Sequence, residues 1–120
     1  MLINFSNHPL SVWSEKQIKI AKEQYGDIVD IPFPNVEPDK GEQYIRELVD
    51  EYIEKVKTLK YGQSTAVHIM GEMNFVYSMV TKLKNIGFVC IASTTERVVN
   101  TGADGVKVSS FQFVRFRKYE

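Results

Sequence analysis

Hydrophobic positions along the chain follow two kinds of pattern, short continuous runs and stripes with helical spacing. Short apolar runs predict strands at residues 1–5, 65–70 and 88–92, and alternation of apolar and polar residues predicts another at 27–33. Apolar residues at three- and four-residue steps predict three helices, from Ser14 to Gly26, from Asp39 to Lys60 and from Phe75 to Gly87. Two further stretches, 98–99 and 106–119, flank a turn rich in Gly and Asp and predict a terminal β-hairpin.

This alternation of strands and helices predicts an α/β fold. We expect one Rossmann-like domain over residues 1–120, with three α/β/α layers, a mainly parallel sheet and a C-terminal β-hairpin. The first, third and fourth strands should be central because they are the most continuously apolar. In a flavodoxin-like strand order, the chain direction reverses between the first and third strands, and a ligand crevice is expected outside their carboxyl ends.

Local signals mark both ends of the first predicted helix. Ser14 and Gln17 form a capping box, and Trp13 and Ile18 occupy the hydrophobic staple positions around it. Gly26 is the residue type that commonly follows the last turn of a helix. Trp13 is therefore explained by the staple without a ligand.

Charge is balanced over the whole chain but unevenly distributed. The 15 Lys and Arg side chains equal the 15 Asp and Glu side chains, so the surplus needed to bind duplex nucleic acid is missing. Residues 27–54 carry nine acidic against two basic side chains, which predicts a solvated acidic face on the second helix. A small anionic ligand needs only a few cationic groups and helix N-termini, and such a ligand stays compatible with this balance.

Composition narrows the class of protein further. With 120 residues, 43% hydrophobic and 25% charged, the chain resembles an average globular domain with one core. Its one cysteine excludes an intrachain disulfide and fits a reducing compartment. The first residues lack the pattern of a signal peptide, and no apolar run is long enough to span a bilayer. We therefore expect a cytoplasmic protein with no membrane partner.

Polar side chains follow the predicted carboxyl ends of the first, third and fourth strands. These candidate site residues are Ser6, Asn7, His8, Gly71, Glu72, Asn74, Ser93, Thr94, Thr95, Glu96 and Arg97. The hydroxyls of 93–95, free backbone N–H groups and the Arg97 guanidinium would suit phosphate oxygens. The alternative is a hydroxyl-rich turn followed by a surface arginine.

The remaining candidates also have two interpretations each. His8 is either a general acid or base or a loop histidine bonded to local backbone. Gly71 allows close approach of a ligand to the backbone but lacks the spacing of a dinucleotide or P-loop motif. Glu72 either contacts ribose or base, or favours a helix N-terminus electrostatically.

Other reactive residue types are better explained as core. His68 lies within an apolar strand and is expected to be a satisfied core residue, and Cys90 an inert core thiol. No residues have the spacing of metal ligands, and no Ser-His-acid order stands out. We expect no cofactor, and any hydrolytic chemistry should be independent of a metal.

Three segments carry a resemblance to a known group of proteins. Residues 4–10 (NFSNHPL), 68–73 (HIMGEM) and 92–97 (ASTTER) resemble the small single-domain CRISPR-associated Rossmann-like proteins of type III systems. That group is related to the CARF sensor domains, and several of its members are ring nucleases. The resemblance implies a homodimer that binds a cyclic oligoadenylate across its two-fold axis, either as a sensor or as a ring nuclease.

The resemblance also implies roles for individual residues. A ribose 2′-hydroxyl would attack the adjacent phosphodiester without a metal, with the protein holding the groups in line. Arg97 and the 93–95 hydroxyls would hold phosphate, and His8 would transfer the proton. Asn7, Glu72 and Asn74 would contact ribose or adenine.

The last strand carries apolar residues on both faces, at Phe111, Phe113, Val114 and Phe116. One face should meet the core and the other a second copy of the chain, unless a bulge near Phe113 explains the pattern. Two other functions remain open. The chain could be a protein-interaction module that uses the hairpin and the acidic helix, or an enzyme acting on a nucleotide or sugar phosphate in an enclosed pocket.

Overall fold

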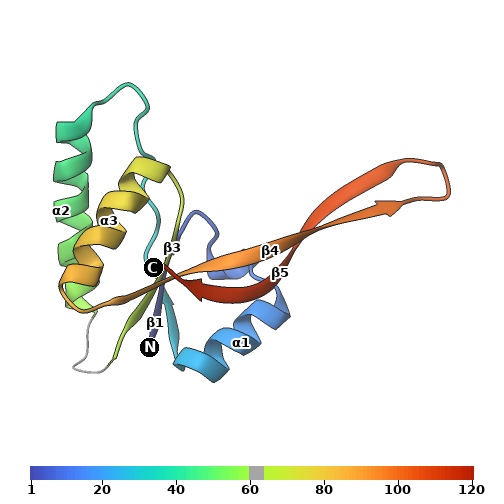
Figure 1. The fold of residues 1–120 in the computed structure, drawn as a ribbon, viewed down its shortest axis with the longest axis horizontal. Coiled ribbons are helices and arrows are strands. Elements are labelled where there is room, and N and C mark those ends of the chain that lie inside the picture. Colours follow the sequence, from blue (N-terminus) through green and yellow to red (C-terminus); the bar gives the residue numbers. More distant parts are fainter. Residues whose placement is uncertain (60–63) are drawn as a thin grey trace.

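The sheet organises the whole chain, and its strand order is β2-β1-β3-β4-β5 (Figure 1). The computed structural model describes residues 1–59 and 64–120. Its strands are β1 (Leu2–Ser6), β2 (Ile28–Asp30), β3 (Ala66–Met70), β4 (Val89–Thr101) and β5 (Lys107–Lys118). Its α-helices are α1 (Glu15–Tyr25), α2 (Glu42–Thr58) and α3 (Met73–Asn85), and a short 3-10 turn spans Leu10–Val12. The first four strands are parallel and β5 is antiparallel to β4, which confirms the predicted fold class and the central position of the first, third and fourth strands. The strand order is flavodoxin-like.

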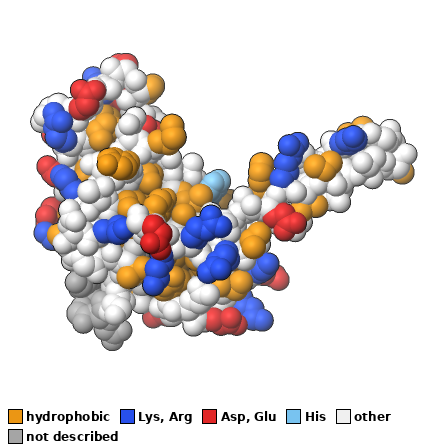
Figure 2. Space-filling view, in the orientation of Figure 1, with side chains coloured by type: hydrophobic (Ala, Val, Ile, Leu, Met, Phe, Trp, Pro, Cys, Tyr) orange, Lys and Arg blue, Asp and Glu red, His pale blue; other side chains and the backbone are white. Residues whose placement is uncertain are grey.

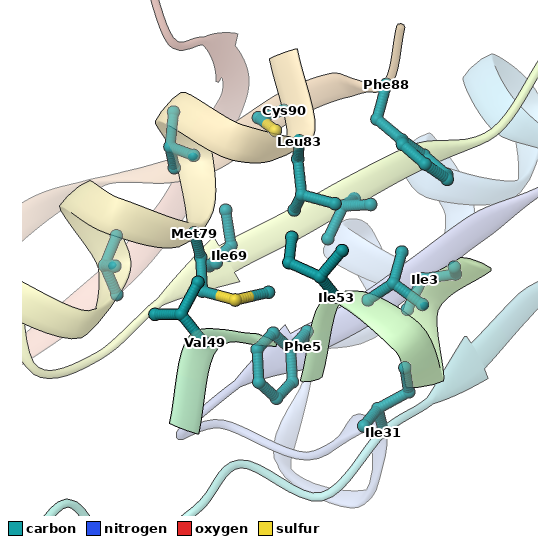
Figure 3. Packing of buried hydrophobic residues seen from close by; sticks show 14 of the residues in the cluster. Ile3, Phe5, Ile31, Val49, Ile53, Ile69, Met79, Leu83, Phe88 and Cys90 are labelled. Atoms are coloured by element: carbon teal, nitrogen blue, oxygen red, sulfur yellow. The ribbon is translucent and has the colours of Figure 1, made fainter. Parts of the chain in front are cut away.

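Helices cover both faces of the sheet and make the three expected layers. On one face, α2 and α3 pack over the alternate residues Ile3, Phe5, Val67 and Ile69 (Figure 3). On the other face, α1 and the root of β5 pack over a smaller cluster that includes Leu2 and Ile91. The side chains of Asn4, His68 and Ser93 point to this second face because strand residues alternate. No helix among residues 1–59 and 64–120 is long and apolar enough to cross a membrane.

The first helix begins at the predicted residue, but the Gln17 side chain does not make the predicted capping contact. The Gln17 backbone N–H donates to Ser14 Oγ at 3.1 Å, and Gly26 ends the helix with φ of 84°. The Gln17 side chain does not return to the cap. Its Nε2 instead donates to Ser93 Oγ at 3.0 Å, so only half of the capping box forms.

The second helix has the expected apolar stripe and a shorter span than predicted. Val49, Ile53 and Val56 are buried, and the acidic side chains of the helix are exposed. The helix starts at Glu42 rather than at residue 39, and the predicted end at Lys60 lies outside the described residues. Likewise β2 covers three residues of the predicted 27–33, because a following segment with two prolines cannot continue the strand.

The last two strands differ most from the prediction. Residues 93–97 were expected to form a loop after a short fourth strand, but they lie inside β4. The strand continues because β5 folds back and pairs with it from Ile91, opposite Lys118, to Thr101, opposite Lys107. Beyond the sheet this pair forms a two-stranded ribbon that projects from the body (Figure 1). The radius of gyration is accordingly 16.2 Å, against roughly 13–14 Å for a compact chain of this length.

A β-bulge sits where the ribbon leaves the sheet. Thr94 pairs with Arg115 and Thr95 with Phe113, so Val114 is the extra residue. The bulge lets Phe113 and Phe116 both enter the cluster beneath α1, although residues three apart in a regular strand face opposite sides. A bulge near Phe113, which was the alternative explanation for apolar residues on both faces of this strand, is therefore present.

Candidate functional site

A groove of about 760 Å³ opens at the carboxyl edge of the sheet. It lies between the first turn of α1, the ends of β3 and β4, and the root of the ribbon. Lys16 and Gln17 of α1, His68 of β3 and Ser93 of β4 contribute side chains to it, together with the loop residue His8. We call it the carboxyl-edge groove, and it occupies the position where this topology is expected to bind ligands.

A row of polar side chains crosses the sheet and reaches this groove at His68 and Ser93. Asp30, Asn4 and His68 are register partners on β2, β1 and β3, and Ser93 of β4 completes the row. Asn4 Nδ2 lies 2.8 Å from Asp30 Oδ1, His68 Nδ1 lies 2.9 Å from Asn4 Oδ1, and His68 Nε2 lies 2.7 Å from Ser93 Oγ. We call these four residues the polar row.

Hydrogen bonding fixes the direction of each bond in the row. Asn4 Nδ2 faces two acceptors, the Asp30 carboxylate and the His8 carbonyl, so its amide oxygen must face His68. His68 therefore donates from Nδ1 and accepts at Nε2. The Ser93 hydroxyl proton is the donor to Nε2, while Ser93 Oγ accepts from Gln17.

Burial sets the charge state of the histidine in this row. Removal from water, and to a smaller extent the nearby His8, lower the pKa of His68 from 6.5 to about 4. His68 is neutral near pH 7 and fully hydrogen-bonded, which confirms that it is a satisfied core residue. It also forms part of the groove wall, a position not predicted from the sequence.

The loop after β1 is held by the same network. The His8 carbonyl accepts from Asn4 Nδ2 at 2.9 Å and from Trp13 Nε1 at 2.9 Å. The Ser6 hydroxyl is buried and lies 2.8 Å from Asn4 Oδ1, so it supports the loop rather than facing the groove. These bonds leave the exposed His8 side chain at the groove, while Asn7 lines a separate cavity of about 400 Å³.

Residues 93–97 divide between the two faces of β4. Ser93 and Thr95 face the groove. Thr94 and Glu96 face the opposite side, and Thr94 Oγ1 bonds the backbone of Arg115 beside the bulge. Pairing with β5 makes this segment an extended strand and occupies alternate backbone N–H groups, so the loop expected to present free N–H groups to a phosphate is not formed.

Arg97 lies further along the ribbon, beyond the groove. Its Nε and Nη2 donate to Ser109 Oγ at 3.3 and 3.0 Å, and the side chain is exposed. It shares a ribbon face with Ser93 and Thr95 and pairs with Phe111, which does line the groove. Within one chain, Arg97 is therefore near the groove but does not contribute to its lining.

The candidate residues at the start of α3 lie outside the carboxyl-edge groove that His8 and Ser93 line. Gly71 lines a separate apolar cavity of about 590 Å³, and a Cβ at this position would overlap the Phe33 ring. The glycine thus makes room for an aromatic side chain rather than for a ligand. Glu72 caps α3 by accepting from the backbone N–H groups of Phe75 and Asn74 at 2.8 and 3.2 Å.

The capping interaction also explains the electrostatics of Glu72. The Phe75 N–H bond holds the pKa of this carboxyl below its usual value, in favour of the charged form. The Asn74 side chain also donates to Glu72. The interpretation of Glu72 as a helix-terminus residue is confirmed, and the single crevice expected to unite 6–8, 71–74 and 93–97 is not formed within one chain.

The residues that the sequence analysis missed are the ones that hold the polar row together. From the sequence, Asn4 is predicted only as a strand residue and Gln17 only as part of a cap, and Lys16 has no predicted role. The available signal was Asn4 within the otherwise apolar run 1–5 and a histidine in the middle of another strand. A Ser-His-Asn arrangement was hidden because its members are far apart in sequence and appear in reverse chain order.

Among the described residues, the cysteine and the possible metal ligands show no sign of a reactive site. Cys90 is buried beneath α3, and desolvation raises the pKa of its thiol to about 11, as expected for an inert core cysteine. In the part of the chain that the structure describes, no group of three or more His, Cys, Asp or Glu side chains is placed to hold a metal ion.

Comparison with known proteins gives one result. A model of the Uncharacterized protein MJ1673 family matches residues 1–117. Neither a search of curated proteins nor a search of solved structures gave a match. Because the matched region covers nearly the whole chain, the chain belongs to the Uncharacterized protein MJ1673 family.

Proposed function

We propose that this protein binds a small anionic nucleotide in the carboxyl-edge groove. The observation that carries the proposal is the placement of cationic and hydrogen-bonding groups around one cavity at the switch point of the sheet. The first turn of α1 meets the groove at Ser14, and Lys16 and His8 stand beside it. Backbone N–H groups at a helix start and a lysine together suit a phosphate.

The rest of the lining suits a base and a sugar. Phe111 is 71% exposed at the groove wall, and an exposed aromatic ring offers a stacking surface to a base. Gln112 and Thr95 supply polar groups next to it. The groove therefore combines an anion-binding end and an aromatic end, which are the two requirements of a nucleotide.

A cyclic oligoadenylate is the specific ligand we propose within this class. The support for it is the resemblance of residues 4–10, 68–73 and 92–97 to type III CRISPR-associated Rossmann-like proteins. Such a ligand would lie across a homodimer, where Arg97 of each chain could reach a phosphate. Ring opening by the ribose 2′-hydroxyl, with His8 transferring a proton, is the reaction that we propose for the enzyme form of this function.

Calorimetry and thermal unfolding with cyclic tetra- and hexa-adenylate, ATP and AMP test the binding proposal. We expect a micromolar or tighter interaction that Lys16→Ala weakens about tenfold, as for loss of one charge-assisted contact. Lys19→Ala is the matched control because Lys19 is exposed on the same helix and is outside the groove lining. Absence of binding by all four nucleotides, or equal loss in both variants, contradicts the proposal.

Chromatography of the same mixtures distinguishes a ring nuclease from a sensor. Linear products that form with the wild type and form much more slowly with His8→Ala support cleavage. Binding with unchanged ligand supports a sensor. Cleavage at equal rates in the wild type and His8→Ala removes His8 from the mechanism.

The projecting ribbon favours a second candidate function, a protein-interaction module. Apolar side chains lie along it (Figure 2), and Val99, Val106 and Val108 are about half exposed or more. A second copy of the chain is the partner that we propose first, since a dimer is also what a shared nucleotide groove requires. Light scattering should give twice the monomer mass, and Val108→Lys with Phe111→Lys should restore the monomer; a monomeric wild type contradicts the dimer.

A further inference from the structure

The polar row has the geometry of an activated nucleophile, which nucleotide binding does not use. Ser93 Oγ lies 2.7 Å from His68 Nε2, and His68 Nδ1 lies 2.9 Å from Asn4 Oδ1. These are the distances of a nucleophile bonded to a base that is itself held by a third group. We propose that Ser93, His68 and Asn4 form a catalytic triad that transfers acyl groups from carboxylic esters.

The tautomer of the base is the correct one for this reaction. Asn4 is held by two acceptors on its amide nitrogen, so its oxygen can only accept from His68 Nδ1. This leaves the Nε2 lone pair directed at the Ser93 hydroxyl proton. An asparagine that presented its nitrogen to the histidine would produce the wrong tautomer, and Asp30 prevents that orientation.

The charge state of the base is also consistent with the reaction. Burial and the nearby His8 keep the pKa of His68 at about 4, so the imidazole is unprotonated near neutral pH and able to accept a proton. The same burial makes imidazolium costly to form. The Asp30 carboxylate is the negatively charged member of the polar row, and it lies 2.8 Å from Asn4 Nδ2. Its charge would offset part of the cost of forming the imidazolium.

Two hydrogen-bond donors lie next to the Ser93 hydroxyl and would be available to an oxyanion formed there. The backbone N–H of Ser93 donates to the thioether of Met70 at 3.3 Å, which is a weak acceptor that an oxyanion would replace. Gln17 Nε2 is the second donor, already 3.0 Å from Ser93 Oγ. A nucleophile whose own backbone N–H stabilises the intermediate is a recurrent arrangement in acyl transfer.

The groove limits the substrate to an ester with an apolar portion. Ser93 opens into the carboxyl-edge groove, which Trp13, Met70 and Phe113 line with apolar surface. A short aliphatic or aromatic acyl group fits this lining, and the edge near Lys16 suits an anionic alcohol portion. The assignment does not depend on nucleotide binding.

The reaction proceeds in two balanced steps. Ser93 Oγ forms a bond to the ester carbonyl carbon, the bond from that carbon to the alcohol oxygen breaks, and the serine proton passes through His68 Nε2 to the leaving alcohol. Water then attacks the acyl-serine, gives one proton through His68 to Ser93 Oγ, and releases the acid. The sum is ester plus water to acid plus alcohol.

A fluorophosphonate probe that reacts with activated serines tests the nucleophile directly. Intact-mass analysis and peptide mapping of the full chain should give one adduct, on Ser93, and Ser93→Ala should give none. His68→Gln should slow labelling at least 100-fold. Ser109→Ala is the matched control, because Ser109 is an exposed serine on the ribbon, and it should label like the wild type.

Release of nitrophenol from p-nitrophenyl acetate and butyrate tests the acyl transfer. We expect one equivalent in an initial burst with the wild type and none above background with Ser93→Ala. Circular dichroism checks that each variant is folded; if His68→Gln is not, Gln17→Ala on the partly exposed face of α1 should still slow labelling about tenfold. No adduct on native wild type, labelling of Ser93 independent of His68 and Gln17, or an adduct without nitrophenol release overturns the proposal.

Discussion

Acidification should destabilise this protein through His68, and the structure gives the size of the effect. The imidazole has a pKa of about 4 in the folded protein against 6.5 as a free side chain. Between these values the unfolded chain binds a proton that the folded chain does not, so the free energy of unfolding rises with pH across this window. A difference of about 2.5 pKa units corresponds to roughly 3 kcal/mol, lost progressively from about pH 6.5 down to about pH 4.

Urea unfolding at pH 4 to 7.5 measures this loss, with the fluorescence of Trp13 and far-UV circular dichroism as probes. Trp13 is a suitable reporter because it is the chain's one tryptophan and is buried beside His68, with ring centroids 5.0 Å apart. Carboxylates also titrate in this range, so the informative quantity is the difference between wild type and His68→Gln. The wild type should lose roughly 3 kcal/mol more than the variant over this range.

A second histidine variant separates the two causes of the shift. Burial is the larger cause and the charge of His8 the smaller one, so His8→Gln should keep most of the pH dependence. Parallel stability curves for wild type and His68→Gln between pH 4 and pH 7 would refute the reasoning. Such a result would mean that the row accepts a proton without loss of stability.

Three further substitutions test individual contacts. Gly71→Ala should cost about 1–3 kcal/mol in urea unfolding because its Cβ overlaps the Phe33 ring, whereas Gly41→Ala, which has open space around it and loses only the preference for glycine at the α2 N-cap, should cost about 1 kcal/mol or less. Glu72→Ala should lower stability by about 1 kcal/mol at pH 7 through loss of the α3 cap, and an unchanged midpoint would mean that the cap is replaced. Asn4→Ala should cost about 2–4 kcal/mol, since it leaves several buried polar groups without partners, and a loss below 1 kcal/mol would contradict the role given to the polar row.

The layers of the fold follow from patterns that are visible within single elements. The run at Leu2–Ser6 is buried at every position, and the stripe on α2 packs as its three- and four-residue spacing predicts. These elements bury enough apolar surface to determine the core by themselves. For this reason the α/β class and the central position of the first, third and fourth strands could be anticipated from the sequence.

The extent of β4 could not be anticipated, because its second half depends on a partner strand. Residues 93–97 are polar and read as a loop, but they become extended when β5 supplies hydrogen bonds along their length. Strand formation here is a property of the pair rather than of either segment. The consequence for the site is that Arg97 lies on a projecting ribbon instead of at the end of a buried strand.

The polar row was invisible for a related reason. Asn4 and His68 are 64 residues apart, and only the register of β1 against β3 makes them neighbours. Gln17 fitted a capping box well enough to conceal that its side chain reaches Ser93. A polar residue within an apolar strand was the one available signal, and it did not identify its partner.

The position of β1 between β2 and β3 also sets when the site can appear during folding. The β4–β5 ribbon joins residues close in sequence and can close quickly, whereas pairing of β1 with β3 must enclose a loop of more than sixty residues. The polar row needs that slow pairing and β4 as well. A chain in which the ribbon has formed but β1 is still unpaired has no groove. A ligand that binds in the groove would therefore stabilise only the completely folded protein, and the fraction of chains with bound ligand would report global folding.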